Sequence, residues 1–188
     1  MTFATTAVVF EQPGRLTLSE LDLAGPGRDD CVVDIEWSGI STGTERLLWL
    51  GQMPDFPGMG YPLVPGYESV GRISSAGETT GLTAGQRVFV PGSRGFDGVR
   101  GLFGGAAARV VVPADRLVPL GEAFAEEGVL LALAATAYHA LAVSGRPVLP
   151  ELIVGHGVLG RLIARLVFAL DGEPPTVWET NPARRGGH

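Results

Sequence analysis

The sequence is poor in cysteine, in basic charge and in long apolar runs, and each shortage excludes a class of protein. Its 188 residues include one cysteine, Cys31, which excludes an intrachain disulfide and a cysteine-rich metal lobe and favours a reducing cytoplasm. A net charge of −6 argues against a sequence-independent nucleic-acid binder. No stretch approaches the roughly 20 apolar residues of a membrane span, and the N-terminus lacks the basic start of a signal peptide. We therefore expect a cytoplasmic globular protein.

Glycine, by contrast, is abundant, with 28 residues, and the hydrophobic period of the chain changes after Pro119. Between Thr6 and Pro119, short apolar strands are separated by glycine, proline and aspartate, a pattern typical of a β-barrel or sandwich-like unit. Residues 122–143 are rich in alanine and leucine, and they predict one long helix.

A strand over 152–154, a glycine turn, a helix over 158–170 and a second strand over 176–179 complete the pattern. This order predicts a β-α-β unit, the opening of a parallel, doubly wound Rossmann sheet. The expected fold class is therefore α/β plus β. We predict a β-rich domain over residues 1–120, and a connecting helix with an incomplete dinucleotide-binding domain over 121–188.

The glycine turn, "GHGVLG" at 155–160, has the spacing of a dinucleotide-binding turn. Gly155 would permit the tight turn, Gly157 the approach of the pyrophosphate, and Gly160 the close packing of helix on strand. The amides at the start of the helix, including those of Val158 and Leu159, would then face the phosphates. The plainer alternative is an ordinary glycine-rich turn that binds nothing.

An acid closes the second strand and suggests which dinucleotide is bound. Glu179 lies close to the position expected for a contact with the ribose hydroxyls, and its charge favours NAD over NADP. Arg184 and Arg185 weaken this preference, because either could pair with a 2′-phosphate. We expect His156, inside the turn, to be a solvent-facing variable position.

Two stretches of the first domain resemble known motifs. "PGYESVGRISSAG" at 65–77 with "GQRV" at 85–88, and "SGISTGTE" at 38–45, resemble signatures of the medium-chain dehydrogenase/reductase superfamily. The resemblance implies a GroES-like β-rich catalytic domain ahead of the Rossmann domain. It also implies a nicotinamide cofactor.

The sequence departs from that superfamily where its zinc enzymes hold their catalytic metal. Tyr67 stands in place of a histidine and Ser41 in place of a cysteine. Of the residues expected around a catalytic zinc, only Glu68 is present. A catalytic zinc needs about three protein ligands, and we therefore predict no zinc site. For Glu68 itself we favour a buried or interdomain polar contact over a direct chemical role.

Without a metal, oxidation of an alcohol requires a protein base or a proton relay. Tyr67 and Ser41 rank first as candidates, although Tyr67 could equally be a packing residue. The remaining candidates are Thr42, Thr44, Glu68 and His139. For His139 the alternative is a core or interface histidine in an alanine-rich helix.

Within the superfamily, the stretches at 38–45, 61–71, 89–116 and 131–141 together resemble the dehydrogenases of bacteriochlorophyll synthesis. This resemblance implies NAD-dependent oxidation of a hydroxyethyl side chain to acetyl on a magnesium tetrapyrrole. The glycine-rich stretch 92–107 could be a flexible loop that receives the macrocycle, or an ordinary strand connection. A second candidate apolar surface comprises Trp49, Met53, Phe56 and Met59.

Two other functions stay open. One is a zinc-independent quinone or enone reductase that prefers NADPH, and the other is an inactive, truncated dinucleotide-binding or assembly module. In the superfamily the nicotinamide-binding strands follow residue 188, so we expect a fragment or short form that holds the adenine side of the cofactor. The sheet edge at 176–179 would pair with a second copy or another chain.

Overall fold

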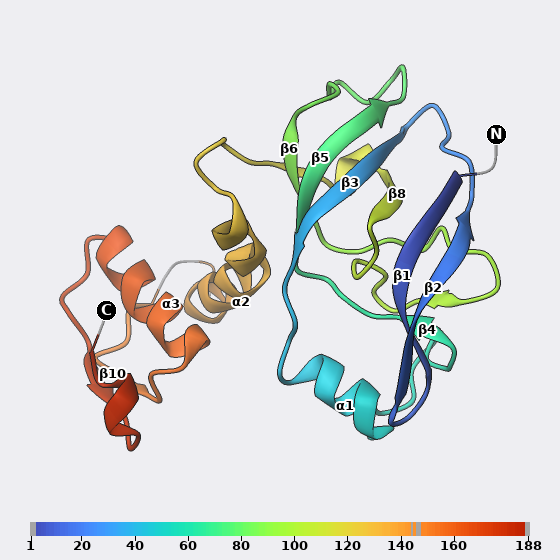
Figure 1. Cartoon of the computed structure of the whole chain (residues 1–188). Helices are drawn as coiled ribbons and strands as arrows, with labels where there is room; N and C mark the ends of the chain where they lie inside the picture. The colour runs from blue at the N-terminus through green and yellow to red at the C-terminus, as the bar shows by residue number, and fades with distance from the viewer. Residues whose placement is uncertain (1–2, 144, 146–147, 187–188) are drawn as a thin grey trace. The chain divides into compact units, whose positions relative to one another are not determined.

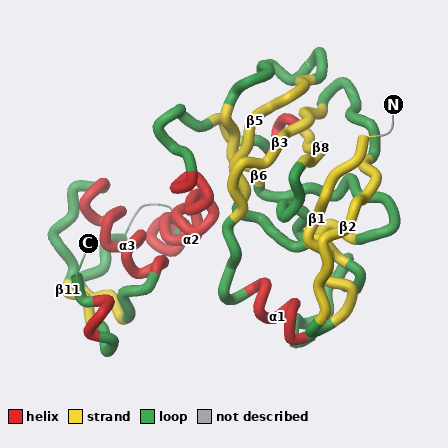
Figure 2. Tube along the Cα trace, viewed as in Figure 1, coloured by secondary structure: helices red, strands yellow, loops and turns green. Residues whose placement is uncertain are grey.

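The computed structural model describes residues 3–143, 145 and 148–186, and the chain divides into two compact units, Met1–Leu130 and Leu131–His188. Figure 1 follows the chain through both, and Figure 2 shows that most strands belong to the first. Within the described residues, no helix is long and apolar enough to cross a membrane.

The first unit consists of two sheets that enclose one core. The first sheet has the order β2-β1-β4-β7 and the second the order β8-β3-β5-β6-β9. The strands are β1 (Phe3–Gln12), β2 (Arg15–Leu23), β3 (Asp30–Ser38), β4 (Leu63–Val64), β5 (Ser69–Ala76), β6 (Arg87–Val90), β7 (Arg100–Gly101), β8 (Arg109–Pro113) and β9 (Val118–Pro119).

The core is built from inward-facing residues of both sheets. Ala7 and Val9 of β1 alternate toward the same buried cluster that contains Val33, Ile73 and Val110 of the second sheet. The pairing of β3 with β5 and with β8 is antiparallel, and it places Val33 opposite Ile73 on one side and Val110 on the other. This arrangement confirms the predicted β-rich domain.

One short helix and two 3₁₀ helices complete this unit. Helix α1 (Thr44–Leu50) follows β3, and the 3₁₀ helices span Ala114–Arg116 and Glu126–Leu130. A smaller apolar cluster of Phe10, Leu48 and Leu63 holds α1 against β1 and β4.

The second unit contains the predicted β-α-β arrangement. Helix α2 (Leu131–Ala142) is followed by β10 (Leu152–Val154), α3 (Val158–Ala169), β11 (Thr176–Trp178) and a 3₁₀ helix, Pro182–Arg184. Strands β10 and β11 are parallel, with Ile153 opposite Val177, and α3 buries Ala164 and Val167. The prediction of a β-α-β unit is confirmed.

The prediction of one long helix over 122–143 is wrong in its first half, where a 3₁₀ helix precedes an α-helix that starts at Leu131. Gly128 explains the difference. It is buried against β5, and a Cβ built on it would lie 2.8 Å from Val70 Cγ2 and 2.9 Å from Leu120 Cδ1. Tertiary packing of the backbone here outweighs the helix propensity of the flanking residues.

Candidate functional site

Three of the predicted catalytic residues lie together where β3 leads into α1. Ser41 Oγ accepts a hydrogen bond from the backbone N–H of Thr44 at 3.2 Å, which caps the first turn of the helix. The hydroxyl groups of Thr44 and Tyr67 are 3.3 Å apart, although the residues are 23 positions apart in the chain. Thr42, in the same loop, is exposed. The geometry thus brings together the hydroxyl group of Thr44, from the "SGISTGTE" segment, and that of Tyr67, from a distant part of the chain.

An aromatic ring fixes the other side of Tyr67. The rings of Tyr67 and Phe103 meet edge to face, with centroids 5.3 Å apart and an interplanar angle of 78°. This is a favoured geometry for aromatic pairs. Phe103 remains 38% exposed, so it presents an apolar surface beside the hydroxyl pair.

Several glycines of the 92–107 stretch, although not Gly95 or Gly98, are required by close contacts. A Cβ on Gly92 would lie 2.1 Å from the carbonyl oxygen of Phe103. The carbonyl oxygen of Ser93 would lie 2.2 Å from a Cβ on Gly101 and 1.9 Å from a Cβ on Gly104. The Ser93 N–H also donates to the Phe103 carbonyl at 2.8 Å. These contacts favour the strand connection over the flexible loop, and they hold Phe103 in place.

Two buried carboxyl groups directly follow the hydroxyl residues in the chain, Glu45 after Thr44 and Glu68 after Tyr67. Glu45 is 7% exposed and Glu68 is 4% exposed. Glu45 Oε2 accepts the Ser41 N–H at 2.9 Å, whereas Glu68 Oε1 has no hydrogen-bond partner among the described residues. A Cβ on Gly39 would lie 2.6 Å from Glu68 Oε2, so glycine at this position makes room for the carboxyl group.

Burial changes the acidity of both groups. It raises the pKa of Glu45 to about 7, with the nearby charge of Glu68 adding to the rise. It also raises the pKa of Glu68 above its ordinary value. A carboxyl group whose pKa lies near 7 can hold or release a proton at neutral pH, which is what a relay for alcohol oxidation needs.

Glu45 was not among the predicted site residues. A signal for it exists, because an acid in the first turn of a helix interacts favourably with the helix N-terminus. Its burial could not be read from this local pattern.

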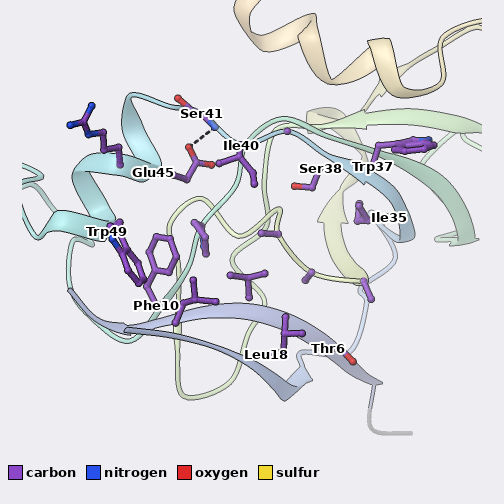
Figure 3. Close-up of a pocket in the computed structure, with 18 of the residues that line it drawn as sticks. Thr6, Phe10, Leu18, Ile35, Trp37, Ser38, Ile40, Ser41, Glu45 and Trp49 are labelled. Atoms are coloured by element: carbon purple, nitrogen blue, oxygen red, sulfur yellow. Dashed lines mark hydrogen bonds between the residues drawn. The ribbon is translucent and has the colours of Figure 1, made fainter. Parts of the chain in front are cut away.

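An apolar groove of about 1000 Å³ is lined by Ser41, Thr42 and Glu45, whereas Thr44, Tyr67 and Glu68 are not among its lining residues (Figure 3). Ser41 and Glu45 form part of one wall, and Phe10, Leu18 and Trp49 lie along the groove. Only Trp49 of the predicted four-residue surface lines it; Met53 and Met59 pack instead on the small cluster around α1. His139 belongs to α2 in the second unit, where it is exposed rather than part of a core.

In the second unit, each glycine of the 155–160 turn has its own structural setting. Gly155 has φ +98°, a left-handed conformation that favours glycine. A Cβ on Gly160 would lie 2.1 Å from the Gly155 carbonyl oxygen, so glycine permits α3 to approach the strand. Around Gly157 no protein atom lies within 4 Å of the Cβ position. Open space there fits the approach of a pyrophosphate, and Val158 and Leu159 are exposed at the start of α3.

Glu179 is held by the turn itself. Its Oε2 accepts the N–H of His156 and its Oε1 that of Asn181, both at 2.8 Å. These two backbone hydrogen bonds hold the pKa of Glu179 below its ordinary value, the Asn181 bond contributing most. The group therefore stays negatively charged at neutral pH, which suits a contact with ribose hydroxyls.

The prediction that His156 faces solvent is wrong. Its side chain is 1% exposed, and its Nδ1 contacts the backbone carbonyl of Arg184. The cause is the 3₁₀ helix after β11, which folds back against the turn and could not be inferred from the local sequence.

The donor set does not fit a catalytic zinc. Within residues 3–143, 145 and 148–186, no group of three or more histidine, cysteine, aspartate or glutamate residues is placed to hold a metal ion.

The fold and the site together define the class of protein. Residues 27–122, more than half of the chain, match the family model of the alcohol dehydrogenase GroES-like domain. The chain belongs to this family, as its motifs predicted.

Two curated bacterial proteins are similar to this chain, and each is named 2-desacetyl-2-hydroxyethyl bacteriochlorophyllide A dehydrogenase. The protein of Rhodobacter capsulatus is 58% identical over 184 residues, and that of Cereibacter sphaeroides is 57% identical over 186 residues. The matches cover 97% and 96% of this chain but 58% of each relative. The chain thus spans a little more than half the length of these relatives.

A solved structure shares the fold. A short chain alcohol dehydrogenase from E. coli CFT073, in complex with NADH, matches with a TM-score of 0.75 at 23% identity. The match covers 96% of this chain and 58% of that one.

Proposed function

We propose that this chain forms part of an NAD-dependent oxidoreductase that oxidises the hydroxyethyl side chain of a bacteriochlorophyllide-type tetrapyrrole to acetyl. The observation that carries the proposal is the identity of 57–58% with two relatives of that name, extending over nearly all of this chain. Because the chain covers 58% of each relative, the proposal concerns the activity of the whole protein.

In this proposal the hydroxyl groups and carboxyl groups of the first unit handle the alcohol proton. Tyr67 Oη and Thr44 Oγ1, 3.3 Å apart, would orient the substrate hydroxyl. A carboxylate of Glu45 or Glu68 would take the proton, and Ser41 would hold the loop. Bound NAD supplies the acceptor for the hydride that leaves the carbinol carbon. His139 is the alternative base, to be tested by replacement with Gln.

The cofactor would occupy the glycine turn of the second unit. Gly155, Gly157 and Gly160 would shape the pyrophosphate site, and the amides of Val158 and Leu159 would face the phosphates. Glu179 supports NAD over NADP because its carboxylate, held in the charged form, would repel a 2′-phosphate.

Arg184 and Arg185 leave this preference in place. The Nε of Arg185 donates to the Glu179 carbonyl at 3.3 Å, and the charge of Arg184 contributes to the low pKa of Glu179. The hydrogen bond attaches Arg185 to the Glu179 backbone, and Arg184 acts on the carboxylate through its charge.

The test supplies NAD and a hydroxyethyl chlorin and follows NADH absorbance together with the red absorption band of the chlorin. We expect both signals to change at the same rate. The Tyr67→Phe variant should lower kcat roughly 100-fold, because it removes a hydroxyl group that orients the substrate. Tyr138→Phe, which changes a 45% exposed tyrosine, is the matched control. Reduction of a quinone with NADPH, without chlorin oxidation, would instead identify a quinone reductase.

A further inference from the structure

His156 lies at the centre of a group of contacts that joins three segments of the second unit. Its backbone N–H donates to Glu179 Oε2 at 2.8 Å, and its Nδ1 contacts the Arg184 carbonyl. Arg161 of α3 donates from Nε to the His156 carbonyl at 3.3 Å and from Nη2 to the Arg184 carbonyl at 3.2 Å. These hydrogen bonds thus connect the glycine turn with the end of β11 and with the 3₁₀ helix that follows.

The contact through the imidazole has a defined direction. A carbonyl oxygen only accepts hydrogen bonds, so Nδ1 of His156 carries the proton and donates to Arg184. Because the ring is 1% exposed, this bond is shielded from competing water. An apolar residue at position 156 would leave the Arg184 carbonyl with one donor fewer.

These contacts determine where the charge of Glu179 lies. One carboxylate oxygen is held by the His156 amide, and the other by the Asn181 amide in the segment that His156 fastens through Arg184. A polar cavity of about 280 Å³ lies at this place, lined by His156, Glu179 and Arg185 with Pro175 and Val177. Ribose hydroxyls bound beside Glu179 would meet a carboxylate that two backbone amides keep in one orientation.

We propose that His156 is a positioning residue that sets the preference of this site for the unphosphorylated adenosine ribose. It acts by holding the 181–185 segment and, through it, the Glu179 carboxylate against the glycine turn. The inference rests on the proposed dinucleotide site and adds to it the residue that determines its specificity.

The test compares NADH and NADPH binding, by isothermal titration calorimetry, in the chain and in two variants. H156L removes the donor at similar volume, whereas H156N places its side-chain amide nitrogen close to where Nδ1 lies. We expect H156L to weaken NADH binding roughly tenfold and NADPH binding much less, so that the Kd for NADPH divided by the Kd for NADH falls. H156N should keep the ratio within about threefold of the original.

Thermal unfolding of each variant separates this role from general stability, which would not change the ratio. If H156L retains the NADH-to-NADPH ratio of the unmodified chain, the inference is wrong. If the unmodified chain binds neither dinucleotide, the proposed cofactor site fails, and the inference fails with it. Should H156L not fold, H156Q provides the same comparison, because its amide lies near Nε2 and cannot reach Arg184 in the same way.

Discussion

Replacing Glu45 with Gln should make the protein more stable at high pH. Burial raises the pKa of Glu45 to about 7 in the folded state, against an ordinary value of about 4.3 in the unfolded chain. Between these values the folded state binds more protons than the unfolded state, so this group lowers stability as pH rises. From pH 5 to pH 8 the loss due to Glu45 is about 2.5 kcal/mol. Gln carries no charge, and its Oε1 can still accept the Ser41 N–H.

The assay is urea unfolding followed by tryptophan fluorescence at pH 5 and pH 8. A Trp178→Phe background leaves Trp37 and Trp49, both in the first unit, so the signal reports on the unit that contains Glu45. Relative to the parent, E45Q should gain about 2.5 kcal/mol between the two pH values. The matched control is Glu78→Gln, because the Glu78 side chain is 80% exposed.

Equal pH dependence of E45Q and its parent would refute the reasoning, since it would mean that Glu45 titrates alike in the folded and unfolded states. A gain of equal size in E78Q would also contradict it, because the effect would then come from net charge rather than from burial.

The remaining predictions concern the glycine turn and the ion pairs of the first unit. Gly160→Ala should lower the melting temperature by several degrees and abolish NADH binding, because its Cβ would lie 2.1 Å from the Gly155 carbonyl oxygen; an unchanged melting temperature would contradict this. Gly157→Ala meets no protein atom within 4 Å, so it should leave the melting temperature unchanged while raising the Kd for NADH at least tenfold in titration. Arg87→Met should cost about 2 kcal/mol in urea unfolding, since it removes a nearly buried guanidinium that bonds Glu36 and the carbonyl of Glu122; a loss below about 0.5 kcal/mol would show that these bonds contribute little.

Local patterns predicted the β-rich first part and the β-α-β unit, but not helix α1 or the 3₁₀ helix ahead of α2. The period of two along residues 6–119 and the glycine spacing at 155–160 reflect interactions within a few residues, which a linear sequence displays directly. The predicted replacement of metal ligands by Ser41 and Tyr67 could also be inferred from the sequence, because it depends only on the residue type at each position. The substrate class came from the resemblance of longer stretches.

Features that depend on distant segments could not be read in this way. Tyr67 meets Thr44 across 23 positions, and His156 meets Arg184 across 28. The sequence does not tell whether a glycine gives flexibility or permits a close backbone contact. At Gly104 the structure shows a close contact with the backbone of Ser93. The 3₁₀ helix before α2 likewise follows from the burial of Gly128 against β5.

The sequence by itself indicated the β-rich first part, the β-α-β unit and the cofactor-type turn, because each is a property of residue type and short-range spacing. Only the tertiary structure decided that Glu45 and Glu68 are buried, that Gly92 and Gly104 lie against the backbone, and that His156 lies inside the protein. The physical reason is that burial and proton affinity depend on which distant groups exclude water from a side chain, and chain folding alone brings those groups together.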